Sequence, residues 1–182
     1  MKKIALIGST GSIGRQVIKV ALRYPERFRI VAMAANSSPL FFEQIARVRP
    51  AFAALRQKTG SPDLAHACAQ TRFASGEAAF EEACAFAEAD VVLVAVSGFA
   101  GLKATLAAIE AGKDVALANK ESLVVGGELV LARARRGRSA GTARWRSARC
   151  LRAGCARPCA RPLPRPDLRP PPGFLYWRGP RL

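Results

Sequence analysis

Three glycines at three-residue spacing follow a short apolar run near the start of the chain. The run covers residues 4–7, and the loop after it reads Gly8-Ser9-Thr10-Gly11-Ser12-Ile13-Gly14. Apolar residues then recur at helical spacing from Ile13 to Tyr24. A tight turn between a strand and a helix directs free backbone N–H groups and the positive end of the helix toward an anion. The segment therefore predicts a βα unit that binds a pyrophosphate, with a glycine-rich turn that binds no ligand as the alternative.

Each of the three glycines has its own predicted role. Gly8 permits the tight turn, Gly11 lets a phosphate approach the backbone, and Gly14 lets the helix pack closely on the strand. The spacing is G-x-x-G-x-x-G, a variant of the G-x-G-x-x-G pattern of dinucleotide-binding proteins. The pattern alone is moderately specific, and its position between a strand and a helix makes it more so.

Short aliphatic runs alternate with amphipathic stretches over residues 1–132. The expected strands are residues 4–7, 28–34, 52–55, 91–96 and 114–118. The expected helices are residues 13–24, 39–48, 63–70, 77–87, 102–111 and 121–132, with Pro25, Pro50 and Gly112 marking three of their ends. This alternation predicts an α/β fold with a doubly wound, Rossmann-type, mainly parallel sheet.

The composition of the chain changes near Leu131. Residues 1–132 carry a net charge of +3, whereas residues 133–182 contain 14 Arg against Asp167 alone. Those last 50 residues also contain 8 Pro, 7 Ala and 5 Gly, with no Lys and no hydrophobic periodicity. We therefore expect a folded domain over residues 1–132 and a low-complexity, disordered Arg/Pro-rich tail over residues 133–182.

The sequence leaves two explanations of this tail open. Arg, Pro, Ala and Gly all have G+C-rich codons, so the composition is typical of a G+C-rich gene read out of frame after Leu131 or Arg136. The alternative is an arginine-rich arm that binds RNA or DNA through phosphate charges, with Trp145, Tyr176 and Trp177 available for stacking. A tail that has no specific nucleic-acid function would still bind any polyanion non-specifically through its charge.

Neither a membrane span nor a secretory signal is expected. The longest aliphatic run, residues 91–96, is far shorter than the ~20 apolar residues of a membrane helix. Lys2 and Lys3 precede an apolar run of four residues, whereas a signal peptide needs roughly 7–15. The chain has five cysteines, and an odd number without a signal peptide argues against a disulfide framework. The C-x4-C-x3-C spacing of the last three is a poor match to a zinc site. We expect a cytoplasmic protein in which Cys68 and Cys84 are small core hydrophobes.

The end of the second expected strand discriminates between dinucleotides. Rossmann-type folds bind the adenosine ribose there, and an Asp or Glu accepts a hydrogen bond from the free 2′-hydroxyl of NAD. This chain has no acid at that point, but Ala35, Asn36, Ser37 and Ser38. Asn and Ser can donate to the 2′-phosphate of NADP, which a carboxylate would repel, so we expect NADP. Ser38 before Pro39 also suits a helix N-cap, and both roles can hold at once.

Polar residues also follow the expected strand at 114–118. Asn119, Lys120 and Glu121 would stand at the carboxyl edge of the sheet, where open α/β folds bind their ligands. A lysine there offers a point charge for a phosphate, and the other two offer amide and carboxylate contacts. By itself, such a segment is more often a helix N-terminus with an acidic first turn.

With these segments in place, residues 1–132 resemble the N-terminal NADPH-binding domain of the 1-deoxy-D-xylulose 5-phosphate reductoisomerases. The resemblance rests on the blocks IALIGSTGSIG, FRIVAMAANSS and VSGFAGLKATLAAIEAGKDVALANKESLV. It implies an NADPH-dependent rearrangement and reduction of 1-deoxy-D-xylulose 5-phosphate to 2-C-methyl-D-erythritol 4-phosphate, a step of isoprenoid synthesis by the non-mevalonate pathway. The glycine loop alone would also suit a semialdehyde dehydrogenase, which would need a catalytic Cys in a further domain.

The resemblance also implies roles for individual residues. The NADPH pyrophosphate would lie in the cradle of Thr10, Gly11, Ser12 and Ile13, between Gly8 and Gly14. The 2′-phosphate would lie by residues 35–38, where family members usually have Lys or Arg followed by Asn and this chain has Ser37 and Ser38. Asn119 and Glu121 would contact the nicotinamide side of the cofactor, and Lys120 would contact the sugar phosphate.

One part of the family pattern is absent from this sequence. In the family, the next strand ends in an Asp-Ser-Glu motif that holds the Mg²⁺ or Mn²⁺ needed for the rearrangement. After Glu128 the chain has Asp167 as its one acid, so we assign no metal ligand and no catalytic residue. We expect a truncated or frameshifted chain without activity, and the oligomeric state is not predicted because family homodimers form through the missing part. A stand-alone NADP-binding module and an Arg-rich nucleic-acid-binding protein are the other functions left open.

Overall fold

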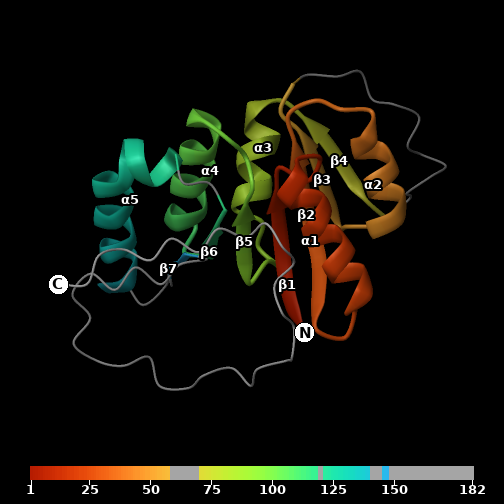
Figure 1. The fold of residues 1–182 in the computed structure, drawn as a ribbon, viewed down its shortest axis with the longest axis horizontal. Helices are drawn as coiled ribbons and strands as arrows, with labels where there is room; N and C mark the ends of the chain where they lie inside the picture. The colour runs from red at the N-terminus through yellow and green to blue at the C-terminus, as the bar shows by residue number, and fades with distance from the viewer. Residues whose placement is uncertain (58–69, 119–120, 140–144, 148–182) are drawn as a thin grey trace. The chain divides into compact units, whose positions relative to one another are not determined.

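The computed structural model describes residues 1–57, 70–118, 121–139 and 145–147, and all of these belong to one unit, Met1–Cys150. Figure 1 shows a sheet with helices on both of its faces. In chain order the elements are β1 (Lys2–Ile7), α1 (Ser12–Arg23), β2 (Phe28–Ala35), α2 (Leu40–Val48), β3 (Phe52–Leu55), β4 (Arg72–Ser75), α3 (Glu77–Cys84), β5 (Val91–Val94), α4 (Phe99–Glu110), β6 (Asp114–Leu117), α5 (Glu121–Ser139) and β7 (Trp145–Ser147).

The strand order is β4-β3-β2-β1-β5-β6-β7, and every strand pair in the described residues is parallel. From β1 the chain builds outward through β2, β3 and β4, then returns to β5 on the other side of β1 and builds the opposite way. This confirms the predicted doubly wound fold. At the reversal point, Ile7 pairs with Val94, so the carboxyl ends of β1 and β5 lie side by side. Open α/β sheets bind ligands at this switch point.

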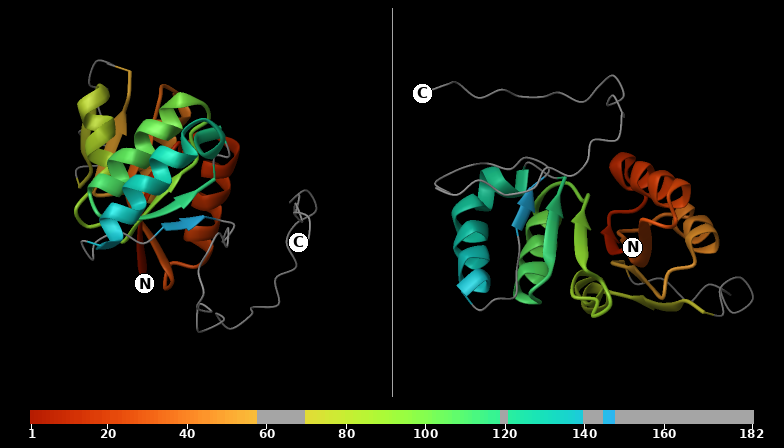
Figure 2. Two further views of the ribbon diagram at one scale, coloured as in Figure 1. Left: turned by 90° about the vertical axis from the view of Figure 1, so that its left-hand side faces the viewer. Right: turned by 90° about the horizontal axis from the view of Figure 1, so that it is seen from below.

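Apolar side chains of β1 alternate between two core layers. Ala5 and Ile7 belong to the cluster packed against α3, α4 and α5, whereas Ile4 and Leu6 belong to the cluster packed against α1 and α2. The helices cover both faces, as the two views of Figure 2 show, and α4 lies against α5. A central strand therefore needs apolar residues on both faces, which explains the continuous apolar runs in the sequence.

The structure differs from the sequence-based expectations in the middle of the chain. Strand β4 was not expected, because it is short, partly exposed and contains Arg72 and Ser75 in place of aliphatic residues. Helix α3 ends at Cys84 instead of residue 87, and β5 ends at Val94 instead of residue 96. The helix expected over residues 63–70 lies outside the described residues except for Gln70. Within the described part of the chain, no helix is long and apolar enough to cross a membrane.

Helix α5 runs across the composition change at residue 132. Its Val130 and Ala134 are buried in the core, and the helix continues to Ser139. At Gly126 the backbone leaves the helical region (φ −124°, ψ 17°), so α5 is bent there. Beyond it, β7 pairs in parallel with β6, with Trp145 opposite Val115.

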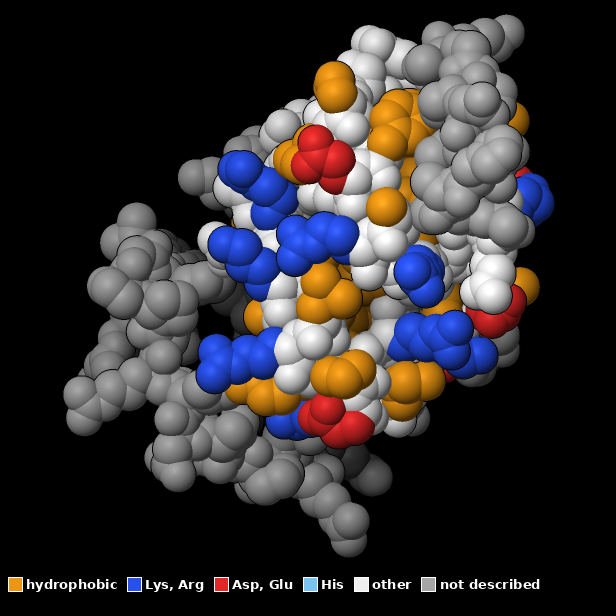
Figure 3. Space-filling model, turned by 90° about the vertical axis from the view of Figure 1, so that its right-hand side faces the viewer, with side chains coloured by type: hydrophobic (Ala, Val, Ile, Leu, Met, Phe, Trp, Pro, Cys, Tyr) orange, Lys and Arg blue, Asp and Glu red, His pale blue; other side chains and the backbone are white. Residues whose placement is uncertain are grey.

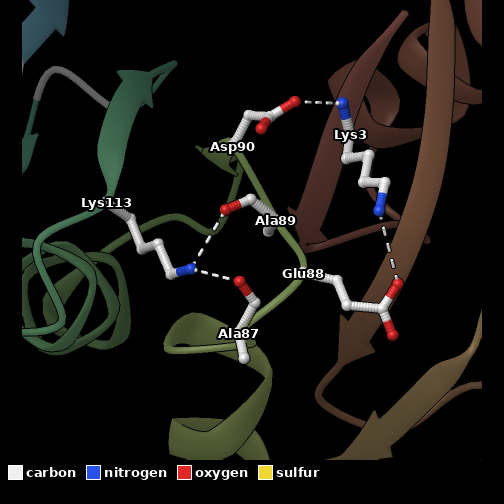
Figure 4. Close-up of polar contacts among 6 residues, drawn as sticks. All are labelled: Lys3, Ala87, Glu88, Ala89, Asp90 and Lys113. Carbon is white, nitrogen blue, oxygen red and sulfur yellow. Dashed lines mark hydrogen bonds and ion pairs between the residues drawn. The ribbon is translucent and has the colours of Figure 1, made fainter.

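The segment that leads into β5, residues 87–90, is held from both of the neighbouring strands (Figure 4). The backbone N–H of Lys3 donates to Asp90 Oδ2 at 2.8 Å, and Lys3 Nζ lies 3.6 Å from Glu88 Oε2. From the side of β6, Lys113 Nζ donates to two carbonyl oxygens of the segment, at 2.7 and 3.1 Å. These contacts fix the start of β5 at the amino edge, opposite the edge that carries the candidate site.

Candidate functional site

Gly8 follows β1 in a conformation that only glycine adopts readily. Its φ is +92°, and a Cβ built on it would lie 2.8 Å from both the carbonyl carbon and the oxygen of Ala95. The chain that follows β5 therefore packs directly on the backbone of the turn. This geometry agrees with the tight turn expected at Gly8.

Gly14 lies in the first turn of α1 and contacts the loop that precedes the helix. A Cβ on Gly14 would lie 2.2 Å from the carbonyl oxygen of Gly8 and 2.7 Å from Cα and C of Ser9. The close approach expected at this glycine is present, but it joins the helix to the loop backbone instead of to the strand. Helix α1 is thereby seated on residues 8–9.

Gly11 is the N-cap of α1, with φ −69° and ψ 170°, and it provides no side-chain cap. A Cβ there would meet Gly8 O at 3.4 Å and Ala95 O at 3.7 Å, which are ordinary contacts. The backbone itself therefore does not require glycine at this position. What the glycine provides is open space above the first turn, where Ser12 and Ile13 are exposed and the helix N–H groups lack intrahelical acceptors.

Hydrogen bonds fix the inner side of the loop. The N–H groups of Gly8 and Ser9 both donate to Ala34 O of β2, at 2.8 and 3.1 Å, and Gly11 N–H donates to Gly8 O at 3.2 Å. Thr10 is partly exposed. The arrangement is a rigid turn with a helix N-terminus behind it, which is suited to binding an anion.

Gln44 of α2 also holds the loop, and the sequence analysis did not identify it. Its side chain is buried, and Nε2 donates to Ser9 O at 3.0 Å. The signal was present in the sequence, because Gln44 lies three residues after Phe41 and four before Val48, on the apolar face of the helix. A single amide on an otherwise apolar face marks a specific polar contact in the interior.

Residues 35–38 lie next to this loop, at the carboxyl end of β2. Ala35 is buried, Asn36 and Ser37 are exposed, and Ser38 is half-buried. The carbonyl oxygens of Ala35 and Asn36 accept hydrogen bonds from the chain that follows β3, at 2.9 and 3.0 Å. The side chains of Asn36 and Ser37 are thus presented to solvent from a fixed backbone.

The N-cap expected at Ser38 does not form. Pro39 precedes α2 as its cap residue in the αR conformation, and no side chain caps the helix. Ser38 instead accepts the N–H of Phe41 with its backbone carbonyl, at 3.0 Å. Since proline fixes φ near its helical value, the turn forms without help from the serine hydroxyl.

The third predicted segment lies largely outside the described residues. Ala118 donates its N–H to Val94 O at 2.9 Å, which brings the carboxyl end of β6 beside that of β5. Asn119 and Lys120 are outside the described residues, and so is the side chain of Glu121, the first residue of α5. The structure therefore brings together residues 8–14 and 35–38, and it leaves the positions of these three side chains untested.

Positive charge is concentrated on the part of the unit that carries the loop. Residues 1–57 contain ten Lys and Arg against Glu26 and Glu43. Figure 3 shows the face formed by α1 and α2, where Lys and Arg side chains are spread among apolar ones. A field of this sign attracts a phosphorylated ligand.

Beside the end of β3, Arg56 is engaged by α3. Its Nε donates to Glu77 Oε2 at 2.6 Å and its Nη2 to Oε1 at 3.2 Å, while Lys103 Nζ lies 3.6 Å from Glu77. The hydrogen bond from Arg56 lowers the pKa of Glu77 below its ordinary value, and the same bond raises the pKa of Arg56. Glu77 is thus the counterion of two cations near the site.

Metal ligands are not clustered in the described residues. Among the residues whose side chains the structure describes, no group of three or more His, Cys, Asp or Glu lies close enough to hold an ion. Hard cations such as Mg²⁺ are bound by carboxylate oxygens. The described residues therefore do not fit a magnesium site, whereas the uncapped helix and glycine turn do fit a dinucleotide.

Comparisons with known proteins point to one family. The sequence profile of 1-deoxy-D-xylulose 5-phosphate reductoisomerase matches residues 4–127. Over 136 residues the chain is 46% identical to the enzyme of that name from Acaryochloris marina, covering 72% of this chain and 34% of the relative. It is also 46% identical to that of Anaeromyxobacter sp. (strain K), covering 74% and 35%. The chain thus spans about a third of the length of these curated relatives.

Solved structures give the same result. The reductoisomerase from Zymomonas mobilis in complex with NADPH superposes with a TM-score of 0.71 and 34% identity, covering 81% of this chain and 39% of that one. A DOX-P reductoisomerase in complex with NADPH, fosmidomycin and magnesium has a TM-score of 0.64 and 30% identity, covering 81% and 36%. The residues matched by the family profile, 4–127, include the glycine loop.

Proposed function

Because the chain belongs to the 1-deoxy-D-xylulose 5-phosphate reductoisomerase family, we propose that it binds NADPH at the carboxyl edge of its sheet. The observation that carries the proposal is the N-terminus of α1, which has no side-chain cap and is seated on a turn closed by Gly8 and Gly14. Such an N-terminus stabilises a negatively charged group through its dipole and its free N–H groups. The complex of a relative with NADPH supports this choice of ligand.

The residues around the turn have distinct proposed tasks. The N–H groups of Thr10, Ser12 and Ile13 bind the pyrophosphate. Gly11, whose own N–H donates to Gly8 O, belongs to this cradle because the absence of a side chain there leaves the approach open. Bound NADPH would supply the hydride for the reduction. Asn119 and Glu121 orient the nicotinamide half, and Lys120 binds the phosphorylated substrate.

Residues 35–38 are the proposed site of the adenosine 2′-phosphate. Asn36 and Ser37 are exposed beside the loop and bring no negative charge. Both side chains can donate hydrogen bonds to a phosphate, whereas an acid would repel it. This composition supports NADPH over NADH.

We further propose that this chain binds its cofactor without converting the sugar phosphate. The family reaction requires a cation held by carboxylates, and Asp167 is the single acid after Glu128. Metal-dependent oxidation of NADPH by the pure chain, upon addition of 1-deoxy-D-xylulose 5-phosphate, would contradict this proposal.

Titration calorimetry of the full chain with NADPH and with NADH tests the cofactor assignment. The two ligands differ only in the 2′-phosphate, so we expect tighter binding of NADPH by about tenfold or more, which is the effect of one or two charge-assisted hydrogen bonds. Equal affinities would remove residues 35–38 from the proposal. No binding of either ligand would overturn it.

The Arg-rich residues 133–182 require a control, because their charge would bind the phosphates of either dinucleotide non-specifically. Added salt weakens such purely electrostatic binding. Binding that persists in high salt and still prefers NADPH over NADH would support the glycine-loop site. Binding that is lost in high salt without any preference between the two dinucleotides would assign it to the tail.

A further inference from the structure

A buried side chain of α2 determines which way one peptide of the glycine loop faces. Gln44 is 6% exposed, and its Nε2 reaches across to the carbonyl oxygen of Ser9 at 3.0 Å. We propose that Gln44 is a positioning residue for cofactor binding: by holding Ser9 O, it keeps the N–H of Thr10 directed at the phosphates. This inference rests on the proposed NADPH site.

The geometry of the peptide bond between Ser9 and Thr10 carries the argument. A trans peptide is planar, so its C=O and N–H point in opposite directions. Gln44 holds the C=O of Ser9 in the interior, and the N–H of Thr10 therefore points outward, at a residue that is partly exposed. An outward N–H at a helix N-terminus is a donor for an anion.

A reversal of this peptide would change the character of the loop. It would turn the Thr10 N–H inward and present the carbonyl oxygen of Ser9 to the phosphates. The negative phosphate oxygens would repel this carbonyl oxygen. The other side of Ser9 is already fixed, since its N–H donates to Ala34 O at 3.1 Å. The hydrogen bond from Gln44 to Ser9 O opposes the reversal on the Thr10 side.

Packing alone does not explain an amide at this position. Gln44 Oε1 and Ser9 Oγ are buried and have no hydrogen-bond partner among the described residues. Unpaired buried polar atoms destabilise a fold, and an apolar side chain of the same length would fill the space between Phe41 and Val48 without that penalty. The hydrogen bond of this amide goes to the glycine loop. Positioning of the loop for cofactor binding therefore explains the glutamine better than packing does.

The test compares Gln44→Met and Gln44→Glu with the wild-type chain. Methionine keeps the length and volume of glutamine, and glutamate keeps its shape, but neither has the Nε2 donor. We expect both variants to bind NADPH about tenfold more weakly or worse. We expect the midpoint of urea unfolding of Gln44→Met to stay unchanged or to rise. A role in stability alone would instead lower the midpoint and leave the affinity intact.

Two matched controls isolate the amide. Glu43→Gln changes the exposed neighbour on α2 and should leave the affinity unchanged. Ser9→Ala removes the unpaired hydroxyl but keeps the carbonyl, and it should change the affinity by less than about twofold. If Ser9→Ala weakens NADPH binding and Gln44→Met does not, the hydroxyl is the functional group and the inference is wrong. If the wild-type chain does not bind NADPH, the proposed function fails first, and this inference with it.

Hydrogen exchange of the wild-type chain gives a readout that needs no variant. The amide of Thr10 should exchange quickly in the free chain, because it points to solvent, and become protected when NADPH binds. Protection of Thr10 in the free chain would mean that the peptide faces inward, which would overturn the inference. NADPH binding without added protection at Thr10 would overturn it as well, while leaving the cofactor assignment in place.

Discussion

The carbonyl oxygen of Gly8 occupies the place that a side chain at Gly14 would need, since a Cβ there would lie 2.2 Å away. The obstacle is backbone, which cannot move aside as the end of a flexible side chain can. The two glycines therefore constrain each other: the turn at Gly8 sets where its carbonyl lies, and Gly14 allows α1 to begin directly on it. This contact places the helix N-terminus at the switch point of the sheet.

Gly14→Ala should disrupt the loop and abolish NADPH binding. The methyl group must push α1 away from residues 8–9, so we expect a loss of about 3 kcal/mol in the free energy of unfolding. Gly127→Ala on α5 is the matched control, because a Cβ there meets nothing within 4 Å. That variant should be as stable as the wild type or up to about 1 kcal/mol more stable, since alanine favours a helix. Urea unfolding and calorimetry measure both effects, and a stable Gly14→Ala chain that binds NADPH would contradict the role of the contact.

The sequence predicted the elements that depend on local pattern and missed those that depend on partners. The runs that became β1, β2 and β5 are apolar on both faces, and such runs are identifiable without a structure. The strand β4 is not, because it carries Arg72 and Ser75 in place of aliphatic residues and is identified by its backbone pairing with β3. The guanidinium of Arg72 also lies 4.2 Å from the ring centroid of Phe52 in β3, a contact that no local pattern indicates.

The same distinction holds at the candidate site. Gly8, Gly11 and Gly14 were found from spacing, since the chemistry of a strand–turn–helix unit is local in sequence. Gln44 was not found, although its bond to Ser9 spans 35 residues and determines one face of the loop. Its polarity on an apolar stripe was visible, but its partner follows only from how α2 packs on β1 and β2. The roles of Asn119, Lys120 and Glu121 stay predictions.

Asn36→Asp should change the choice of dinucleotide. The new carboxylate would repel a 2′-phosphate and accept a hydrogen bond from the 2′-hydroxyl of NADH. We expect the affinity for NADPH to fall by about tenfold or more, and that for NADH to stay constant or rise. Asn36→Ala separates the loss of the amide from the gain of charge and should have a smaller effect. Calorimetry with both dinucleotides measures the ratio of the affinity for NADPH to that for NADH. If Asn36→Asp leaves this ratio unchanged, the 2′-phosphate binds elsewhere.

Cys84 should be unreactive in the folded chain. It is the last residue of α3 and is buried in the core, and this burial raises its pKa to about 12, so almost no thiolate forms at pH 8. Iodoacetamide followed by peptide mass mapping should find Cys84 modified only after unfolding in urea. Because the folded pKa is raised, the unfolded chain ionises first as the pH rises above about 8.5, and stability then falls. The loss should be smaller in Cys84→Ala, and rapid labelling of the native chain would contradict the burial.

Glu77 should make a small contribution to stability that is lost in acid. Its pKa is lowered chiefly by the hydrogen bond from Arg56, so the folded chain holds the carboxylate charged more strongly than the unfolded chain does. The contribution is present above the ordinary carboxyl pKa, near pH 4.5, and disappears as the pH falls through the lower folded value. The side chains of Arg56 and Glu77 are 31% and 42% exposed, so solvent screening limits the effect to about 0.5 kcal/mol. Urea unfolding of Glu77→Gln and of the wild type should therefore differ by about this amount at pH 7, and the difference should shrink as the pH falls below the ordinary carboxyl pKa. A difference that persists undiminished at pH 3 would show that the charge is not its source.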